Sequence, residues 1–374
     1  MVPSVLSPGD FIRAELENRG WGQDDLARVL GRSLTRVNDL LHGKQSVSPE
    51  IAIDLAAALG STADEWLRRE SAYRLSLADG DARGVQRRAR LYELAPIREM
   101  QKRGWIKTTA DVDEIESEIL RFFEIASIDE EPAIETVLRA STPNAALTHA
   151  HRAWCIRVRQ IAKSVVVPPY REDRIERCLE KLRKLAAYSP EIRKAPGILA
   201  SFGIRLIVVE PLASGTKIDG MTTWLDDHSP VIGLSLRHDR IDGFWHTLCH
   251  EMIHVRYRDR LSVDIEIAEP GEVSLSVKPP MERRADAEGA AVLIDPKELD
   301  SFIRRVGPLY SKERINQFAN RIKMHPGIIV GQLQHRGEID YSHNREMLVK
   351  VRQAITAVSL TDGWGVAIDS RVLE

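Results

Sequence analysis

The chain has 374 residues, of which 43% are hydrophobic and 29% charged, and this composition is typical of globular proteins with two or three domains. No apolar run approaches the roughly 18 residues of a membrane helix, and the N-terminal residues MVPSVLSPGD lack the basic and apolar regions of a signal peptide. We therefore expect a cytoplasmic protein that does not enter a membrane. The net charge of −2 excludes a global attraction to nucleic acid, and three scattered cysteines exclude a disulfide framework.

Residues 1–78 predict a domain of five short helices. The helices are expected to begin at Ser7-Pro8, Gln23, Ser33, Ser48-Pro49 and Thr62. Four of these five starts carry a serine or threonine that can cap the helix, and two also carry a proline that favours the first turn. Glycines end the first three of them: Gly20, Gly31 and Gly43. The second and third helices are short and joined by a tight turn, which is the helix-turn-helix arrangement.

Residues 79–169 predict a helical connector. Residues 81–107 hold eight Lys/Arg against three acidic residues, which indicates either a solvated helix face or a surface for phosphate groups. The sequence VVVPPY at residues 165–170 breaks the helical pattern and marks the expected entry to the next domain.

Residues 170–340 predict an α+β domain, and residues 341–374 are assigned to a C-terminal extension. Three β-rich runs separated by Gly and Asp turns predict a small antiparallel sheet: residues 204–209, 221–225 and 231–236. Helices follow the sheet; Asp242 is expected to cap one of them and Pro280 precedes another. The whole chain is therefore predicted to be mainly α with a small antiparallel β-sheet.

The sequence HTLCHEMIHV, residues 246–255, has the spacing of a metal-binding helix. His250 and His254 are four residues apart, so both imidazoles lie on one helix face and can bind one ion. Glu251 can take a proton from a water held beside that ion, as in a hydrolytic zinc site. The alternative is a pair of core histidines bonded to backbone carbonyls. The surrounding apolar residues favour the ion, because buried polar groups are costly unless something satisfies them.

A third metal ligand is available downstream. Glu282 opens the next expected helix, Asp286 lies four residues further on the same face, and Glu288 points elsewhere. His246 extends the histidine row but cannot reach the same ion, since three such histidines span about 12 Å of helix. Cys249 points away from the ligand face and is expected to be a packed thiol.

Two stretches resemble known families. Residues 11–67 resemble the helix-turn-helix of HigA-family antitoxins, within the phage-repressor-like group, through Gly20-Trp21-Gly22-Gln23, Leu26-Ala27, Leu30-Gly31, Gly43-Lys44, Ser48-Pro49, Leu59-Gly60 and Trp66. Residues from about 170 to 340 resemble the ImmA/IrrE family of metallopeptidase-like proteins through Asp242-Gly-Phe-Trp245, His250-Glu251-x-x-His254, Glu282-x-x-Ala285-Asp286 and HPGIIVGQL at 325–333. Together these stretches cover about two thirds of the chain.

The second resemblance implies a zincin-like domain with a defined site. It makes His250, His254 and Glu282 the Zn²⁺ ligands and Glu251 the general base. The chain departs from the family pattern at Glu288-Gly289, where an aromatic residue and Ala are usual, which puts the packing beneath the third ligand in question. Candidates for stabilising an oxyanion are Tyr257, His335 and Tyr341.

The first resemblance implies binding to double-stranded operator DNA. The third helix is expected to enter the major groove, with base edges read by Ser33, Thr35, Arg36 and Asn38. Phosphates are expected to contact Gln23, Arg32 and Lys44. Residues 1–78 hold nine Lys/Arg against eleven Asp/Glu, so an alternative is a protein-interaction module. Domains of this kind usually form homodimers that match two half-sites.

These patterns predict a DNA-binding transcriptional regulator of antitoxin or repressor type that carries a zinc peptidase domain. The resemblance implies that the substrate is a repressor or antitoxin protein and that a toxin is a possible partner. The alternative is a non-catalytic antitoxin-type repressor whose peptidase-like domain only senses a signal or binds a partner.

Overall fold

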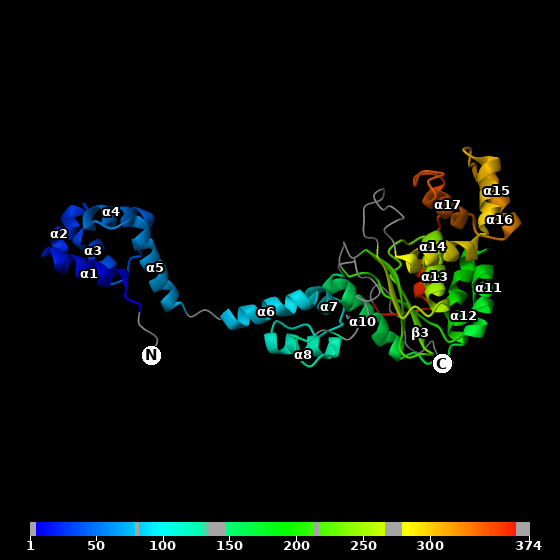
Figure 1. The fold of residues 1–374 in the computed structure, drawn as a ribbon, viewed down its shortest axis with the longest axis horizontal. Helices are drawn as coiled ribbons and strands as arrows, with labels where there is room; N and C mark the ends of the chain where they lie inside the picture. The colour runs from blue at the N-terminus through cyan, green and yellow to red at the C-terminus, as the bar shows by residue number, and fades with distance from the viewer. Residues whose placement is uncertain are drawn as a thin grey trace. The chain divides into compact units, whose positions relative to one another are not determined.

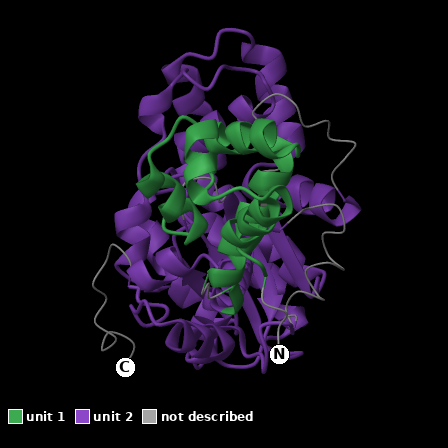
Figure 2. Cartoon of the chain, turned by 90° about the vertical axis from the view of Figure 1, so that its left-hand side faces the viewer, with its two compact units in different colours: residues 1–83 green, residues 84–374 purple. Residues whose placement is uncertain are grey.

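A computed structural model describes residues 5–78, 82–130, 132, 147–212, 217–265 and 279–363. The chain divides into two compact units, Met1–Arg83 and Gly84–Glu374, which Figure 2 colours separately. The predicted boundary after residue 78 lies close to this division. Each unit has a hydrophobic core of its own and is described by itself.

The first unit contains five helices: α1 (Pro8–Arg19), α2 (Gln23–Val29), α3 (Leu34–Leu41), α4 (Pro49–Leu59) and α5 (Ala63–Leu77). Local capping explains where they start. The side chains of Ser7, Ser33, Ser48 and Thr62 each accept a hydrogen bond from a backbone N–H in the first turn of α1, α3, α4 and α5. Gly20 and Gly60 follow α1 and α4 in the left-handed conformation that glycine adopts without strain. The helices enclose a core around the fully buried Trp66.

The second unit is built around a mixed five-stranded sheet with the order β4-β2-β3-β1-β5. Its strands are β1 (Arg205–Val208), β2 (Ile218–Trp224), β3 (Pro230–Leu234), β4 (Leu261–Ile265) and β5 (Leu360–Thr361). The expectation of a wholly antiparallel sheet is wrong in one respect. β2 pairs antiparallel with β3 and β4, but β1 pairs in parallel with β3 and β5. The reason is that β2 folds back on β3 through a short turn, which places β3 between β2 and β1.

Alternate side chains of the strands pack into two different cores, because successive residues of a strand point to opposite faces. Leu206 and Val208 of β1 belong to one core, whereas Ile207 belongs to the other. The core of Ile207 is covered by α6 (Ala82–Leu94), α7 (Ile97–Lys102), α8 (Val112–Phe123) and α10 (His149–Lys163). Of these helices, α10 packs directly on the sheet, and α8 packs on α10 (Figure 1).

The opposite face of the sheet carries the remaining helices. They are α11 (Ile175–Leu185), α12 (Ala195–Ser201), α13 (Ile241–Arg256), α14 (Pro280–Leu293), α15 (Pro296–Val306), α16 (Lys312–Ile322), α17 (Pro326–His335) and α18 (Arg352–Thr356). Short 3-10 helices are η1 (Glu172–Arg174), η2 (Ser189–Lys194) and η3 (Arg345–Met347). The unit thus has helices on both faces of its sheet, in keeping with the α+β class expected.

The start of α13 differs from the prediction. The N-cap is Arg240, and Asp242 lies in the first turn, where its carboxylate accepts two hydrogen bonds from the Arg240 guanidinium. Asp242 is not needed as a cap because the N–H of Ile241 donates to the carbonyl of Val349. A backbone hydrogen bond to Val349, which is distant in sequence, therefore takes the place of the predicted side-chain cap.

The basic run at residues 81–107 is used for ion pairs within the second unit. Arg87 pairs with Asp113 and Glu116 of α8, and Arg103 pairs with Asp362 in the interior. These pairs favour the interpretation of the run as a structural surface rather than a phosphate site. Across the described residues, no helix combines the length and apolar character needed to cross a membrane.

Candidate functional site

Three side chains from α13 and α14 converge on one point in the second unit. His250 and His254 extend from the same face of α13, and their Nε2 atoms lie 3.0 Å apart. Glu282, in the first turn of α14, places Oε2 at 3.1 Å from Nε2 of His250 and 3.5 Å from Nε2 of His254. Ligands held at about 2.0–2.1 Å from a tetrahedral zinc lie about 3.3 Å from one another. The separations of the three atoms therefore fit one such ion.

The other nitrogen of each imidazole is held by a carboxylate. Nδ1 of His250 lies 3.0 Å from Oδ1 of Asp286, and Nδ1 of His254 lies 2.8 Å from Oδ2 of Asp259. Arg284 donates to the same oxygen of Asp259 at 2.9 Å. Carboxylates in these positions fix the ring orientation and leave Nε2 to bind a metal. Asp286 is thus placed as an orienting partner of His250.

The carboxylate of Glu282 is fixed by a strand. The hydroxyl of Ser262, on β4, donates to Oε1 of Glu282 at 2.6 Å, which leaves Oε2 toward the two imidazoles. Burial disfavours the charged carboxylate, but hydrogen bonds and charge from the two imidazoles hold the pKa of Glu282 well below its usual range. Glu282 is therefore a carboxylate, as a metal ligand must be.

The pKa values of the two imidazoles are shifted upward. Burial lowers the pKa of His254, but hydrogen bonds to Asp259 and Glu282 outweigh it and raise that pKa to about 9. Burial likewise lowers the pKa of His250, whereas Asp286 and Glu282 raise it well above its ordinary value. Such concentrated negative charge around two buried imidazoles is an environment that favours a cation between them.

Glu251 lies next to the three convergent atoms and is fully buried. Burial raises its pKa to about 7. The hydroxyl of Thr222 on β2 lies 2.7 Å from Oε2, while the buried Oε1 has no hydrogen-bond partner among the described residues. Gly220, also on β2, leaves room for this carboxylate, because a Cβ there would lie 2.6 Å from Oε1. One oxygen is thus anchored and the other is available to a proton.

The glycine at position 289 has a steric explanation. A Cβ at this position would lie 2.9 Å from the backbone nitrogen of His250 and 3.1 Å from the carbonyl carbon of Cys249. The glycine therefore allows α14 to approach the backbone of α13 at the first histidine. This close approach brings Glu282 to the histidine pair.

The remaining candidates around the site have other contacts. The hydroxyl of Tyr257 donates to Glu288 at 2.9 Å, and Tyr341 is 60% exposed. The ring of His246 lies between those of His250 and His335, with centroids at 6.5 and 5.9 Å. Cys249 is buried, as are Cys155 and Cys178, in agreement with the expectation of packed thiols.

The predicted DNA contacts lie in the first unit, around α2 and α3. Gln23, Thr35, Arg36 and Lys44 are exposed, and Asn38 is half-buried. Two have structural partners: the hydroxyl of Ser33 caps α3, and Arg32 forms an ion pair with Asp54 of α4 at 2.6 Å. The exposed residues are therefore better placed than Arg32 for contacting a ligand.

Sequence reasoning missed three residues that hold this side-chain cluster: Thr222, Asp259 and Ser262. Asp259 follows His254 by five residues, and that short separation is a signal that could have identified it. Thr222 had no such signal, because the pairing of β2 with α13 joins residues 29 positions apart.

Comparisons with known proteins concern the N-terminal region. The helix-turn-helix family matches residues 12–66. Virulence-associated protein I of Dichelobacter nodosus is 28% identical over 82 residues, which are 22% of this chain and 76% of that protein. The Uncharacterized HTH-type transcriptional regulator YddM of Escherichia coli (strain K12) is 32% identical over 72 residues, 19% of this chain and 77% of that protein. Through its first unit, the chain belongs to the helix-turn-helix family of DNA-binding transcriptional regulators.

Proposed function

We propose that this transcriptional regulator carries a zinc-dependent peptidase in its second unit. The observation that supports the proposal is the convergence of two imidazole nitrogens and one carboxylate oxygen beside a buried glutamate with one unbonded oxygen. Histidines with carboxylate partners on Nδ1 and a glutamate as third ligand are the donor set of hydrolytic zinc sites. His250, His254 and Glu282 would hold the ion.

A zinc ion in this position would supply a Lewis acid and lower the pKa of a neighbouring water to about 7. Glu251 would take a proton at Oε1, while Thr222 holds Oε2 and so fixes the carboxylate plane. Its pKa of about 7 lies close to the pH at which proton transfer in either direction is efficient. Asp286 and Asp259 would keep both imidazoles oriented throughout.

We propose a peptide bond in a repressor or antitoxin protein as the substrate, cleaved by a homodimer bound to operator DNA in the cytoplasm. The presence of a regulator head on the same chain supports a substrate that also acts in transcription. A toxin partner belongs to the same proposal, because repressors of this type act beside toxins in the family that the first unit resembles.

The metal content and proteolytic activity of the full-length chain test this proposal together. We expect one zinc ion per chain in the wild type, its loss in His250→Ala, and its retention in Glu251→Gln with cleavage abolished. His246→Ala is the matched control, since His246 lies on the same helix outside the ligand set. A wild-type chain that holds no divalent metal after purification and zinc addition would contradict the proposal.

Complete burial of the site supports a second candidate, a non-catalytic sensor. His250, Glu251 and His254 are all 1% exposed or less, which suits a metal site that responds to occupancy rather than to a peptide. The two candidates differ in the role of Glu251. Regulation of the operator that is unchanged in Glu251→Gln, with no cleavage by the wild type, favours the sensor.

The exposed residues of α3 are proposed to read the operator. DNA binding is measured by a mobility-shift titration of the full-length protein on its upstream promoter fragment. Arg36→Ala should weaken binding in a sequence-dependent manner, and Lys44→Ala should weaken it on all sequences alike. Salt-independent behaviour or the absence of any shift would instead favour the protein-interaction module.

A further inference from the structure

The first residue of α3 carries an exposed apolar side chain. Leu34 is 49% exposed, whereas Val37, Leu40 and Leu41 further along the same helix are buried in the core of the first unit. Leu34 belongs neither to that core nor to the half-buried apolar residues packed against it. The packing of the first unit therefore makes little use of this leucine.

The backbone that carries Leu34 is held by contacts of the two residues before it. Arg32 forms an ion pair with Asp54 of α4 at 2.6 Å, which ties the turn between α2 and α3 to the body of the unit. The hydroxyl of Ser33 accepts a hydrogen bond from the N–H of Arg36 at 3.4 Å and so caps α3. The start of α3 is thus ordered before any ligand binds, which lowers the entropic cost of recognition.

The surface around Leu34 is polar. Ser33, Thr35 and Arg36 are exposed beside it, and their side chains can form hydrogen bonds with the edges of bases. A leucine forms no hydrogen bond, so a favourable contact of this side chain requires another apolar group. Among the groups that bases present in the major groove, the C5-methyl of thymine is the apolar one.

We propose that Leu34 contacts the C5-methyl group of a thymine and thereby selects thymine over cytosine at one position of the operator. This inference rests on the proposal that α3 reads the operator. It is supported by the match of residues 12–66 to the helix-turn-helix family, because the second helix of that motif lies in the major groove with its first residues near base edges. Cytosine at the same position would place its amino group against the leucine without a hydrogen-bond acceptor.

The test compares two versions of the upstream promoter fragment in a mobility-shift titration of the full-length protein. One fragment contains thymine, and the other contains 2′-deoxyuridine at every thymine position, which lacks only the C5-methyl group. We expect the wild type to bind the deoxyuridine fragment more weakly, by about fourfold for each methyl group in contact. Single replacements of thymine by deoxyuridine then locate the contacted base.

Variants of Leu34 connect this difference to the leucine. Leu34→Ala should bind the thymine fragment more weakly by a similar factor and should lose most of the difference between the fragments, because either change removes the same contact. Leu34→Met keeps an apolar side chain of similar volume and should retain the difference. Ile53→Ala is the matched control, since Ile53 is 61% exposed on α4 and is not among the predicted DNA contacts.

The outcomes separate the role of Leu34 from the function on which it rests. Equal binding of the two fragments by the wild type would overturn the role of Leu34 and leave α3 as the reader of the operator. A difference that Leu34→Ala retains in full, or that Ile53→Ala loses equally, would have the same meaning. The absence of any shift by the wild type would overturn operator binding as well.

Discussion

The two units of the chain differ in how their polar residues are held. In the helix-turn-helix unit, the capping side chains contact neighbours in sequence, as in the capping of α3 by Ser33 and of α4 by Ser48, and the residues predicted to contact DNA are mostly exposed. In the second unit, Glu251 and His254 are buried and are held by residues from other elements. The helices that carry an exposed surface can therefore be specified by local signals, whereas a buried polar cluster requires the complete tertiary structure.

Zinc should stabilise only the second unit, and this is the largest effect that we expect. Free zinc at about 1,000 times its dissociation constant adds about 4 kcal/mol to the free energy of unfolding of the unit that binds it. Hydrogen–deuterium exchange in urea, followed by mass spectrometry, resolves peptides of α13 from peptides of α4. Protection that rises equally in both units, or that persists in His250→Ala, would contradict a site confined to the second unit.

The pH dependence of the metal-free chain should differ between the units. The pKa of His254 is raised from 6.5 to about 9 by Asp259 and Glu282 against the effect of burial, so its stabilising contribution is present below pH 6.5 and is lost as the pH rises through 9. Burial raises the pKa of Glu251 to about 7, so its contribution has the same sign and is lost between pH 4.5 and 7. In the first unit, hydrogen bonds lower the pKa values of Asp10 and Glu50, whose contributions change only in acid.

The measurement is urea unfolding of the chelator-treated chain at about pH 6.5 and about pH 9.5. We expect the second unit to lose up to about 3 kcal/mol over this interval, from a shift of between two and three pKa units. His254→Ala should remove the part of this pH dependence that His254 supplies, and His250, whose pKa is also raised, should supply the remainder. A second unit that gains stability toward alkaline pH would contradict the proposed charge state of the imidazoles.

Gly289→Ala tests the close packing of α14 on α13 within the second unit. The added methyl would meet the backbone of His250 at 2.9 Å, and overpacking of this kind costs about 2 kcal/mol and should also weaken zinc binding. Gly197→Ala is the matched control, because Gly197 lies in α12 with nothing within 4 Å of the added carbon. That control should stabilise the chain by about 0.5–1 kcal/mol. Equal effects of the two substitutions on zinc affinity would show that α14 is not held by close approach.

Ser48→Ala should have the smallest effect on stability, and this effect should be limited to the first unit. The hydroxyl of Ser48 accepts a hydrogen bond from the N–H of Ile51 at 3.3 Å, and loss of such a cap costs about 1 kcal/mol. Hydrogen–deuterium exchange of α4 peptides in increasing denaturant measures this loss of stability. Ser48→Asn retains a capping oxygen and should restore most of the loss; a loss that Asn does not restore would mean that the side chain acts otherwise than as a cap.

The sequence was sufficient to predict the helices of the first unit because their signals are local. The starts at Ser7, Ser33, Ser48 and Thr62 are confirmed, since each of these side chains accepts a bond from the first turn of its own helix. The strands of residues 204–236 were located for the same reason, through β-rich runs between turn residues. The structure brings His250, His254 and Glu282 together, and their role as metal ligands stays a prediction.

What could not be predicted depends on contacts between distant residues. The parallel pairing of β1 with β3 follows from the order of strands in the sheet, which the alternation of side chains does not encode. Asp242 does not cap α13 because a carbonyl more than 100 residues away, that of Val349, accepts the first N–H of the helix. From the sequence, Gly289 was expected to weaken the packing beneath Glu282. In the structure the missing side chain instead allows close packing, because the backbone of His250 faces it.

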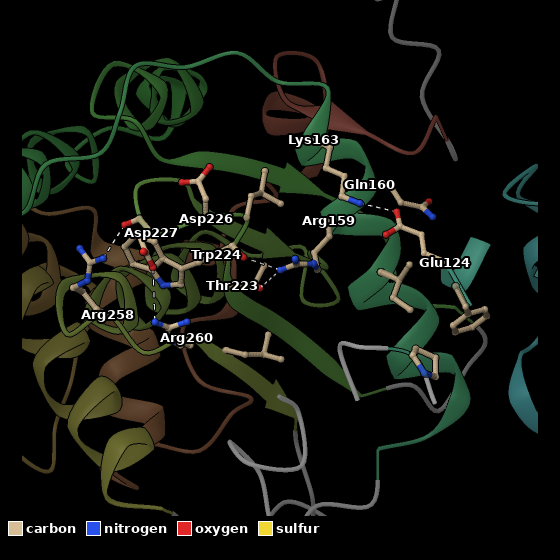
Figure 3. Close-up of a pocket in the computed structure, with 15 residues that line it drawn as sticks. Glu124, Arg159, Gln160, Lys163, Thr223, Trp224, Asp226, Asp227, Arg258 and Arg260 are labelled. Carbon is tan, nitrogen blue, oxygen red and sulfur yellow. Dashed lines mark hydrogen bonds and ion pairs between the residues drawn. The ribbon is translucent and has the colours of Figure 1, made fainter. Parts of the chain in front are cut away.

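The adjacent threonines on β2 make contacts on opposite faces of the strand. Thr222 contacts Glu251 on one face, and Thr223 contacts Arg159 on the other (Figure 3). Side chains alternate along a strand, so deleting or inserting a single residue before the two threonines would turn each of them to the opposite face. Both contacts would then be lost. A substitution can therefore alter one of these contacts alone, whereas a change in the length of the strand alters both.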